Sequence, residues 1–357
     1  MITDRQALIL KAIVQQYIET GQPVGSKALM DLLPTHVSSA TIRNDMASLE
    51  KDGLIEKIHL SSGRIPSVRG YRYYLDNLLK PINISDQTSE LIQSDFAKQE
   101  FNRIDEIVAQ SAKILSTLTS YTAIALGPES KNTKLTGFRI VELNDNQIMA
   151  IIVTSDGAVF NQVYKVPRNS SGEQIEEIVR IINDQLVGET LATVSHRLQT
   201  DFPQLVSRYL QTPNGFLAMF DRFLDKVTAD HFFVDGKSNL FNYVDARNTS
   251  NLKYLYSLFD SDYYLARLLG LDQNDTHDED EHGIQVHLGY ELDPQTLKNY
   301  SLITAKYSVG SHGQGLIALL GPTNMPYSQL IGLIASLRQE LAKQLREYFS
   351  DLNGNSS

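Results

Sequence analysis

Residues 3–53 carry an apolar repeat of helical spacing that is broken at two points, around Gly21–Gly25 and at Pro34. The repeat runs up to the first break, continues between the breaks, and resumes from Ser38 until Gly53. Glycine and proline are the residues that end helices, because glycine adopts the left-handed conformation and proline cannot donate a backbone hydrogen bond. The segment therefore predicts three helices joined by short turns, which is the layout of a helix-turn-helix.

The third of these helices has the composition of a helix that reads DNA. Its apolar residues lie on one face, and the opposite face presents small and polar side chains. Arg43 can donate two hydrogen bonds to a guanine edge, and Asn44 can make a paired contact with adenine. Serines at the helix start suit a phosphate oxygen. The residues of this helix that we expect to contact DNA are Ser38, Ser39, Thr41, Arg43 and Asn44.

The segment after the third helix predicts a β-wing. Residues 54–60 are strand-like, residues 61–63 form a tight Ser-Ser-Gly turn, and residues 64–66 return. Ser67 can cap a further helix that exposes two arginines. We expect the wing and this helix to contact the DNA backbone or the minor groove through Ser62, Arg64, Arg69 and Arg72.

The net charge of -10 argues against a nucleic-acid partner if it is taken for the whole chain. Residues 1–80, however, hold ten Lys or Arg against eight Asp or Glu, whereas the remaining residues hold 22 against 34. Because phosphate attraction needs a basic face, the N-terminal segment is the part of the chain that we expect to bind a polyanion.

Two blocks of residues carry a resemblance to a known family. The first block consists of Pro23–Lys27, Ser39–Met46, Leu49–Ile55, Ser62–Pro66 and Gly70–Tyr74. The second is Leu320–Tyr327, with Val286–Gly289 before it. Together they resemble the heat-inducible transcription repressor HrcA family over nearly the whole chain. The second block departs from the family pattern at Asn324, where the family usually has arginine.

The resemblance implies a repressor that binds the inverted-repeat operator CIRCE ahead of chaperone genes and depends on the chaperonin GroEL. It also implies a GAF-like domain that is split by an insert serving dimerisation. A homodimer is expected on physical grounds as well, because one recognition helix reads only a few base pairs and a second copy doubles the contact.

Residues 81–357 alternate between strand and helix patterns, so we expect an α+β multidomain protein. Strands are expected at residues 123–126, 138–143, 148–154, 158–166, 284–288, 302–309 and 316–320, and helices at Gly172–Leu186 and near the C-terminus. We predict a winged-helix domain at 1–80, a linker and connecting helix at 81–102, a GAF-like domain at 103–190 and 283–350, a mostly helical inserted dimerisation domain at 191–282, and a disordered tail at 351–357.

Three motifs mimic ligand sites. Gly310–Gly315 looks like a phosphate cradle, yet it lies between two expected strands and is better explained as a hairpin turn. Gly236–Ser238 matches the end of a P-loop, but His231 stands where its first glycine is required. The acidic run around His277, Asp278, Asp280 and His282 has the character of a solvated loop. We therefore expect no cofactor, no metal and no enzymatic activity.

No apolar run reaches the ~18 residues of a membrane span, and the absence of cysteine suits a reducing compartment. We expect a cytoplasmic protein whose partners are double-stranded DNA, a second copy of itself and GroEL, with no membrane. Two alternatives remain open. One is a metabolite-responsive winged-helix regulator with a small effector in the GAF-like domain, and the other is an enzyme with an accessory DNA-binding head.

Overall fold

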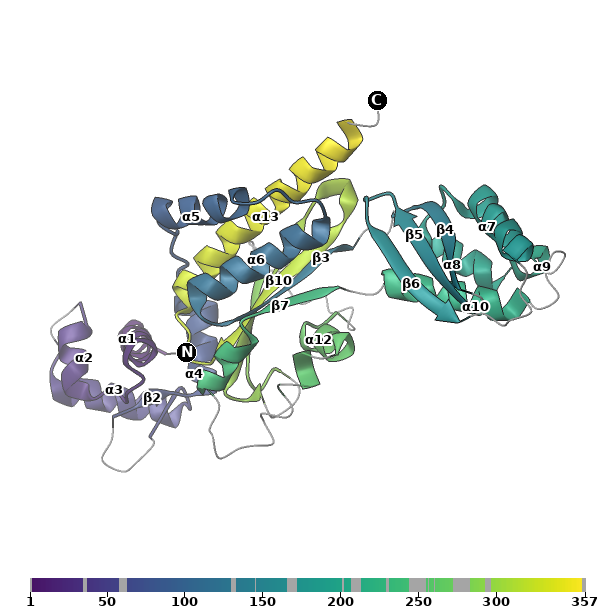
Figure 1. Cartoon of the computed structure of the whole chain (residues 1–357). Coiled ribbons are helices and arrows are strands. Elements are labelled where there is room, and N and C mark those ends of the chain that lie inside the picture. The colour runs from purple at the N-terminus through teal and green to yellow at the C-terminus, as the bar shows by residue number, and fades with distance from the viewer. Residues whose placement is uncertain are drawn as a thin grey trace.

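The computed structural model describes most of the chain, and it shows three parts: an N-terminal module, a five-stranded sheet domain and a unit inserted into that domain (Figure 1). The residues that the structure describes are 2–34, 37–57, 63–129, 133–144, 146–165, 172–200, 202–206, 213–228, 231–243, 255, 257–259, 261–271, 283–292 and 297–354.

The N-terminal module confirms the predicted helix-turn-helix with its wing. Its elements are α1 (Asp4–Thr20), α2 (Ser26–Leu32), α3 (Ser39–Lys51), β1 (Ile55–Glu56), β2 (Ile65–Pro66), α4 (Val68–Tyr73) and the π-helical turn η1 (Tyr74–Leu78). Thr3 and Gln6 form a reciprocal capping box at the start of α1, and Gly21 ends that helix in the left-handed conformation. The apolar faces of α1 and α3 meet in a core that contains Ile9, Ile13 and Ile42.

The sheet domain is built on five antiparallel strands in the order β7-β3-β10-β9-β8. These strands are β3 (Thr122–Glu129), β7 (Phe232–Asp235), β8 (Ile284–Leu288), β9 (Tyr300–Ser308) and β10 (Gln314–Pro322). The turn η4 (Gly310–His312) joins β9 to β10, which confirms that the glycine-rich motif is a hairpin turn.

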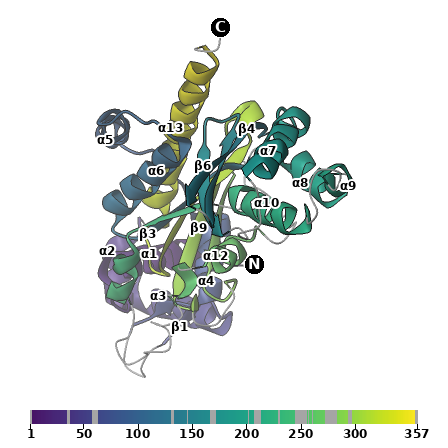
Figure 2. The same cartoon turned by 45° about the vertical axis from the view of Figure 1, so that its right-hand side comes forward.

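Helices cover both faces of this sheet. Ile317 and Leu319 of β10 share a core with α6 (Ile104–Thr119) and α13 (Tyr327–Gly354), and α5 (Asp86–Ala97) packs against those two helices (Figure 2). Leu316 and Leu320 point to the other face, toward η2 (Lys237–Tyr243) and α12 (Asp262–Leu268). Burial on both faces explains the unbroken apolar run of β10, because alternate residues of a strand face opposite sides of the sheet.

The inserted unit contains β4 (Leu135–Asn144), β5 (Gln147–Thr154) and β6 (Val159–Lys165), which form a separate antiparallel sheet in that order. Its helices are α7 (Gly172–Leu186), α8 (Leu191–Gln199), α9 (Phe202–Val206) and α10 (Pro213–Thr228). Phe138 of β4 and Phe220 of α10 lie at the centre of its core, with ring centroids 4.5 Å apart.

The fold class is the α+β multidomain arrangement that we predicted, but the division of the chain differs. Among the described residues, the strands at 135–165 pair with one another in a separate sheet, so the interruption lies between β3 and β7. It begins well before the predicted insert at 191–282 and overlaps its first part. It also contains a sheet, whereas a mostly helical insert was expected. Hydrophobic alternation identifies a strand without showing which sheet it joins. At the C-terminus, α13 continues through Gly354, into the segment predicted to be a disordered tail.

Candidate nucleic-acid interface

Helix α3 begins with a complete side-chain cap. The hydroxyl of Ser38 accepts a hydrogen bond from the backbone N–H of Thr41 at 3.1 Å, and the two hydroxyls lie 2.9 Å apart. This cap occupies one of the free N–H groups at the helix start, and the exposed Ser38 hydroxyl stays at the surface. The first turn of α3 is therefore ordered before any ligand binds.

The two predicted base-reading residues lie side by side on the exposed face of α3. The Nε of Arg43 donates a hydrogen bond to the hydroxyl of Ser26 at 3.2 Å, and that hydroxyl lies 3.1 Å from the hydroxyl of Ser39. The Asn44 side chain is exposed and has no hydrogen-bond partner among the residues that the structure describes. The exposed face of α3 thus presents the guanidinium of Arg43, which Ser26 orients, next to the amide of Asn44, which has no partner among the described residues.

Ser26 is a site residue that the sequence reasoning missed. Helix α2 begins after Gly25, which forms no side-chain cap, and the Ser26 hydroxyl lies 3.1 Å from the hydroxyl of Ser39 at the start of α3. Two exposed cations were also missed, Lys27 on α2 and Lys51 at the end of α3. The available signal was the position of Lys27 at the start of α2, directly after the turn that joins α1 to α2.

Asp45, the neighbour of Asn44, holds α3 in place from its buried side. Arg5 of α1 makes two hydrogen bonds to its carboxylate, at 2.7 Å and 3.2 Å, and the Asp45 side chain is only 9 % exposed. The hydrogen bond and charge of Asp45 raise the pKa of Arg5 above its ordinary value. The pair clamps the recognition helix to α1, because an arginine fork fixes the plane as well as the distance of a carboxylate.

The wing arginine has a structural role. Arg64 donates to the carboxylate of Glu50, at the end of α3, at 2.7 Å and 3.0 Å, and its backbone pairs with Val24. Lys57 lies 3.6 Å from the same carboxylate. Arg64 therefore connects the wing to the recognition helix, and the carboxylate of Glu50 neutralises its charge in the absence of DNA. Ser62, the other predicted wing contact, lies outside the described residues.

The two arginines of α4 point in different directions. Arg69 is exposed and lies beside Gly53 at the end of α3, so it remains available to a phosphate. Arg72 was expected to contact the DNA backbone, but its guanidinium turns toward the sheet domain and binds Glu291. The pattern of α4 could not show this, because the partner lies 219 positions downstream.

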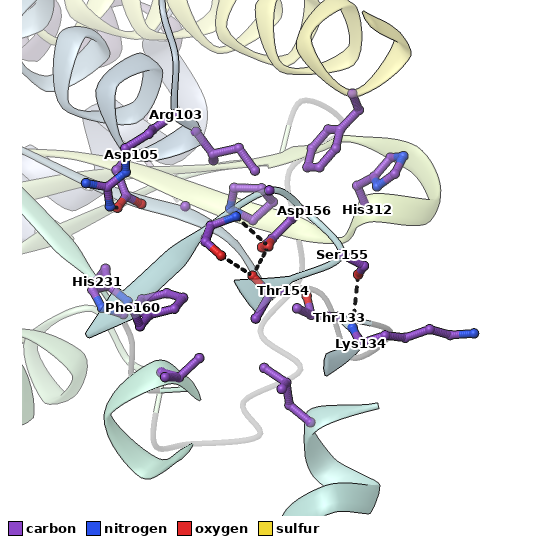
Figure 3. A pocket seen from close by; sticks show the side chains of 18 of the residues that line it. Arg103, Asp105, Thr133, Lys134, Thr154, Ser155, Asp156, Phe160, His231 and His312 are labelled. Atoms are coloured by element: carbon purple, nitrogen blue, oxygen red, sulfur yellow. Dashed lines mark hydrogen bonds and ion pairs between the residues drawn. The ribbon is translucent and has the colours of Figure 1, made fainter. Parts of the chain in front are cut away.

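A cavity of about 980 Å³ lies between the inserted unit and the sheet domain (Figure 3). His312 stacks on Phe349 at its rim, with centroids 3.8 Å apart, and His231 lies 5.9 Å from the ring of Phe160. Some of its charged groups have partners within the protein: Arg103 binds Asp105 at 2.6 Å, and the Asp156 carboxylate accepts from the Thr154 hydroxyl and from a backbone N–H. The acidic run at 277–282 lies outside the described residues.

Comparison with known proteins decides the family. A model of the HrcA protein C-terminal domain matches residues 105–331, which is more than half of the chain. The chain belongs to the HrcA family. Its N-terminal residues 5–63 match a DeoR-like helix-turn-helix domain.

Curated HrcA proteins align with the chain from end to end. The "Heat-inducible transcription repressor HrcA" of Ligilactobacillus salivarius is 49 % identical over 99 % of this chain and 100 % of its own length. The protein of the same name from Enterococcus faecalis is 48 % identical over 98 % of this chain and 99 % of its own length. A crystal structure described as a hypothetical protein shares the fold, with a TM-score of 0.59 and 23 % identity over 99 % of this chain and 100 % of its own length.

The second block of the HrcA resemblance lies where the N-terminal module meets the sheet domain. Leu320–Tyr327 connects β10 to α13, and Tyr327 is completely buried against Tyr71 of α4. Within the described part of this HrcA-family chain, no helix has both the length and the apolar character of a membrane span. The same residues contain no group of three or more side chains arranged to hold a metal ion.

Proposed function

We propose that the chain is a transcription repressor that binds DNA as a homodimer, with α3 of each protomer in the major groove. The observation that carries this proposal is the exposed pair of Arg43 and Asn44 on a capped helix that Arg5 and Asp45 clamp to α1. Small residues on the same face let the helix approach base edges. Ser38, Ser39 and Thr41 at the helix start, with Arg69 beyond its end, are the proposed phosphate contacts.

The outer face of the inserted sheet supports the dimer. Val141, Met149 and Val163 lie side by side across the three strands, and Val153 and Val159 form a second pair on the same face. Val141, Val159 and Val163 are 43 %, 51 % and 44 % exposed, although they are apolar. Helices α7, α8 and α10 cover only the opposite face. An exposed apolar sheet face of this kind is typical of a contact between proteins, and we assign it to a second copy.

The target and the control of the repressor follow from the family resemblance. We propose that the operator is the inverted repeat CIRCE ahead of chaperone genes, and that the GroEL chaperonin keeps the repressor active. A two-fold repeat suits a dimer that carries one recognition helix in each protomer. These features make the repressor a sensor of chaperonin occupancy inside the cytoplasm.

The decisive experiment selects bound duplexes from a random DNA pool with the full-length protein at fixed salt. The proposal expects an inverted repeat with one spacing between its halves, and the repeat of CIRCE in particular. Recovery of no sequence preferred over random competitor would refute DNA reading by α3.

A second experiment tests the dependence on the chaperonin. The fraction of refolded protein that binds the operator should rise when GroEL is present. An equal fraction with and without GroEL would remove that part of the proposal.

The cavity between the inserted unit and the sheet domain favours a second candidate, a regulator that responds to a small metabolite. A ligand bridging the two parts would raise the melting temperature of the full-length protein, since binding to the folded state alone stabilises it. A thermal scan against a metabolite library tests this. A saturable shift that also changes operator affinity would support the second candidate, and no shift would leave the chaperonin-dependent repressor as the only candidate.

A further inference from the structure

Arg72 reaches from the DNA-binding module into the sheet domain. Its Nε donates to Glu291 at 3.0 Å, one terminal nitrogen donates to the other Glu291 oxygen and to the carbonyl of Val286 at 2.8 Å, and the second terminal nitrogen lies 3.3 Å from Asp76. Glu291 is itself held by the backbone N–H of Leu288 at 2.8 Å. The contact is a two-pronged arginine–carboxylate pair between elements that are distant in sequence, and such a pair fixes orientation as well as separation.

The surroundings of Arg72 keep its guanidinium positively charged. Burial alone would lower its pKa, but the hydrogen bond and charge of Glu291, together with the charge of Asp76, raise the pKa above its ordinary value. Both partners are partly shielded from water, with side chains 28 % and 25 % exposed. The pair is therefore less screened by salt than an ion pair at the open surface.

A separate contact holds the chain that leaves the module. The backbone N–H of Ile82 donates to the carbonyl of Ser328 at 3.2 Å, and the Ser328 hydroxyl donates to the carbonyl of Lys80. Gly332 of α13 permits this approach, since a Cβ there would lie 2.0 Å from the carbonyl oxygen of Ile82. The module is also held by the packing of Tyr71 against the buried ring of Tyr327. Ring packing fixes orientation less tightly than a two-pronged charged pair, so we assign the direction of the module to the contact of Arg72.

We propose that the Arg72–Glu291 pair is an interdomain latch that fixes the direction of α3 relative to the sheet domain, and so sets the spacing between half-sites that the dimer accepts. The spacing part rests on the proposed function, because it requires a DNA-binding dimer. With the latch closed, both recognition helices are presented at one separation, and the second half-site is bound at a high effective concentration. With the latch broken, the DNA-binding modules sample many directions. The effective concentration at the second half-site is then lower, and it no longer favours one spacing.

The orientation is measured first, without DNA. The natural chain has no cysteine, so cysteines placed at Glu19 on α1 and Lys113 on α6, both exposed, can carry a pair of spin labels. Labelled protein is diluted with an excess of unlabelled chain, so that only distances within one protomer are recorded. We expect a narrow distance distribution in the parent, a broad one in Glu291→Gln and Arg72→Met, and a narrow one in the control Asp76→Asn. The control removes the Arg72 partner that belongs to the module itself.

The DNA measurement follows with the same variants. The parent should bind best at one half-site spacing, whereas Glu291→Gln and Arg72→Met should lose about tenfold in affinity there and lose the preference among spacings. Affinity for a single half-site should stay within about twofold, because the reading face is unchanged. Distance distributions or spacing preferences equal to those of the parent would overturn the latch. If the parent binds no duplex selectively, the proposed function fails, and the distance measurement still tests the latch.

Discussion

Tyr71 and Tyr327 lie edge to face between the DNA-binding module and the sheet domain, with ring centroids 6.3 Å apart, and their hydroxyl groups have opposite surroundings. The hydroxyl oxygen of Tyr327 lies 2.8 Å from the Ser301 hydroxyl and 2.5 Å from the carbonyl oxygen of Thr323. The hydroxyl of Tyr71 is buried and has no hydrogen-bond partner among the described residues. One ring thus anchors the interface through polar contacts, and the other contributes only apolar packing.

This difference predicts opposite effects for two identical substitutions. Tyr71→Phe should leave the free energy of unfolding unchanged or raise it by about 1 kcal/mol, because it removes a buried hydroxyl that lacks a partner. Tyr327→Phe should lower it by about 1 to 2 kcal/mol, because Ser301 and Thr323 lose their partner. Urea unfolding followed by circular dichroism measures both. A larger loss for Tyr71→Phe than for Tyr327→Phe would show that the Tyr71 hydroxyl is hydrogen-bonded in solution.

Buried tyrosines also predict that the fold loses stability at alkaline pH. Burial raises the pKa of Tyr71, Tyr307 and Tyr327 above the ordinary value of 10, and burial with the nearby Tyr243 raises the pKa of Tyr121 to about 12. Because the folded state holds these protons more tightly, the stability they confer is complete below pH 10. It declines as the pH rises through the folded values.

Urea titrations at a series of pH values, with phenolate absorbance recorded in parallel, test this expectation. The free energy of unfolding should fall as the pH rises above about 10, and Tyr121→Phe should reduce the slope between about pH 10 and 12. Ionisation of every tyrosine while the protein stays folded would contradict the burial argument.

The hydrogen bond from Arg43 to Ser26 predicts that both residues affect which DNA sequence is preferred. Ser26→Ala removes the hydroxyl that orients the guanidinium, so affinity for the selected operator should fall about threefold to tenfold while the melting temperature is retained. Arg43→Ala should cost about 1 to 3 kcal/mol and relax the preference at one base pair. Lys27→Ala is the matched control, since loss of a cation should weaken all sequences alike. Equal losses on operator and random DNA from Arg43→Ala would remove its assigned role.

The exposed face of the inserted sheet predicts how to separate the protomers. Val163→Lys places a charge on that face, on the edge strand β6 beside Met149, and should convert the dimer to a folded monomer that binds operator DNA at least tenfold more weakly. Leu91→Lys on α5 is the control, because Leu91 is a comparably exposed apolar residue on another element. Sedimentation equilibrium reports the mass of each variant. A Val163→Lys protein that remains dimeric would place the interface elsewhere.

Local patterns in the sequence were sufficient for the elements. The bounds predicted for the helix Gly172–Leu186 and for the strand at 284–288 match α7 and β8, and Gly53 takes the left-handed conformation expected at the end of α3. Such elements follow from hydrogen bonds and side-chain spacing within a few residues. The reading face of α3 belongs to this class, because Arg43 and Asn44 are exposed whenever Ile42, Met46 and Leu49 are buried.

Only the tertiary structure decided what those elements and arginines contact. It assigned β4, β5 and β6 to a sheet of their own, turned Arg64 to Glu50, and joined Arg72 to Glu291 across 219 positions. The physical reason is that the edge of a strand, or a guanidinium, can form equally good hydrogen bonds with many different partners. The choice among them depends on which surfaces the packed core brings together, and spacing along the chain carries no record of it.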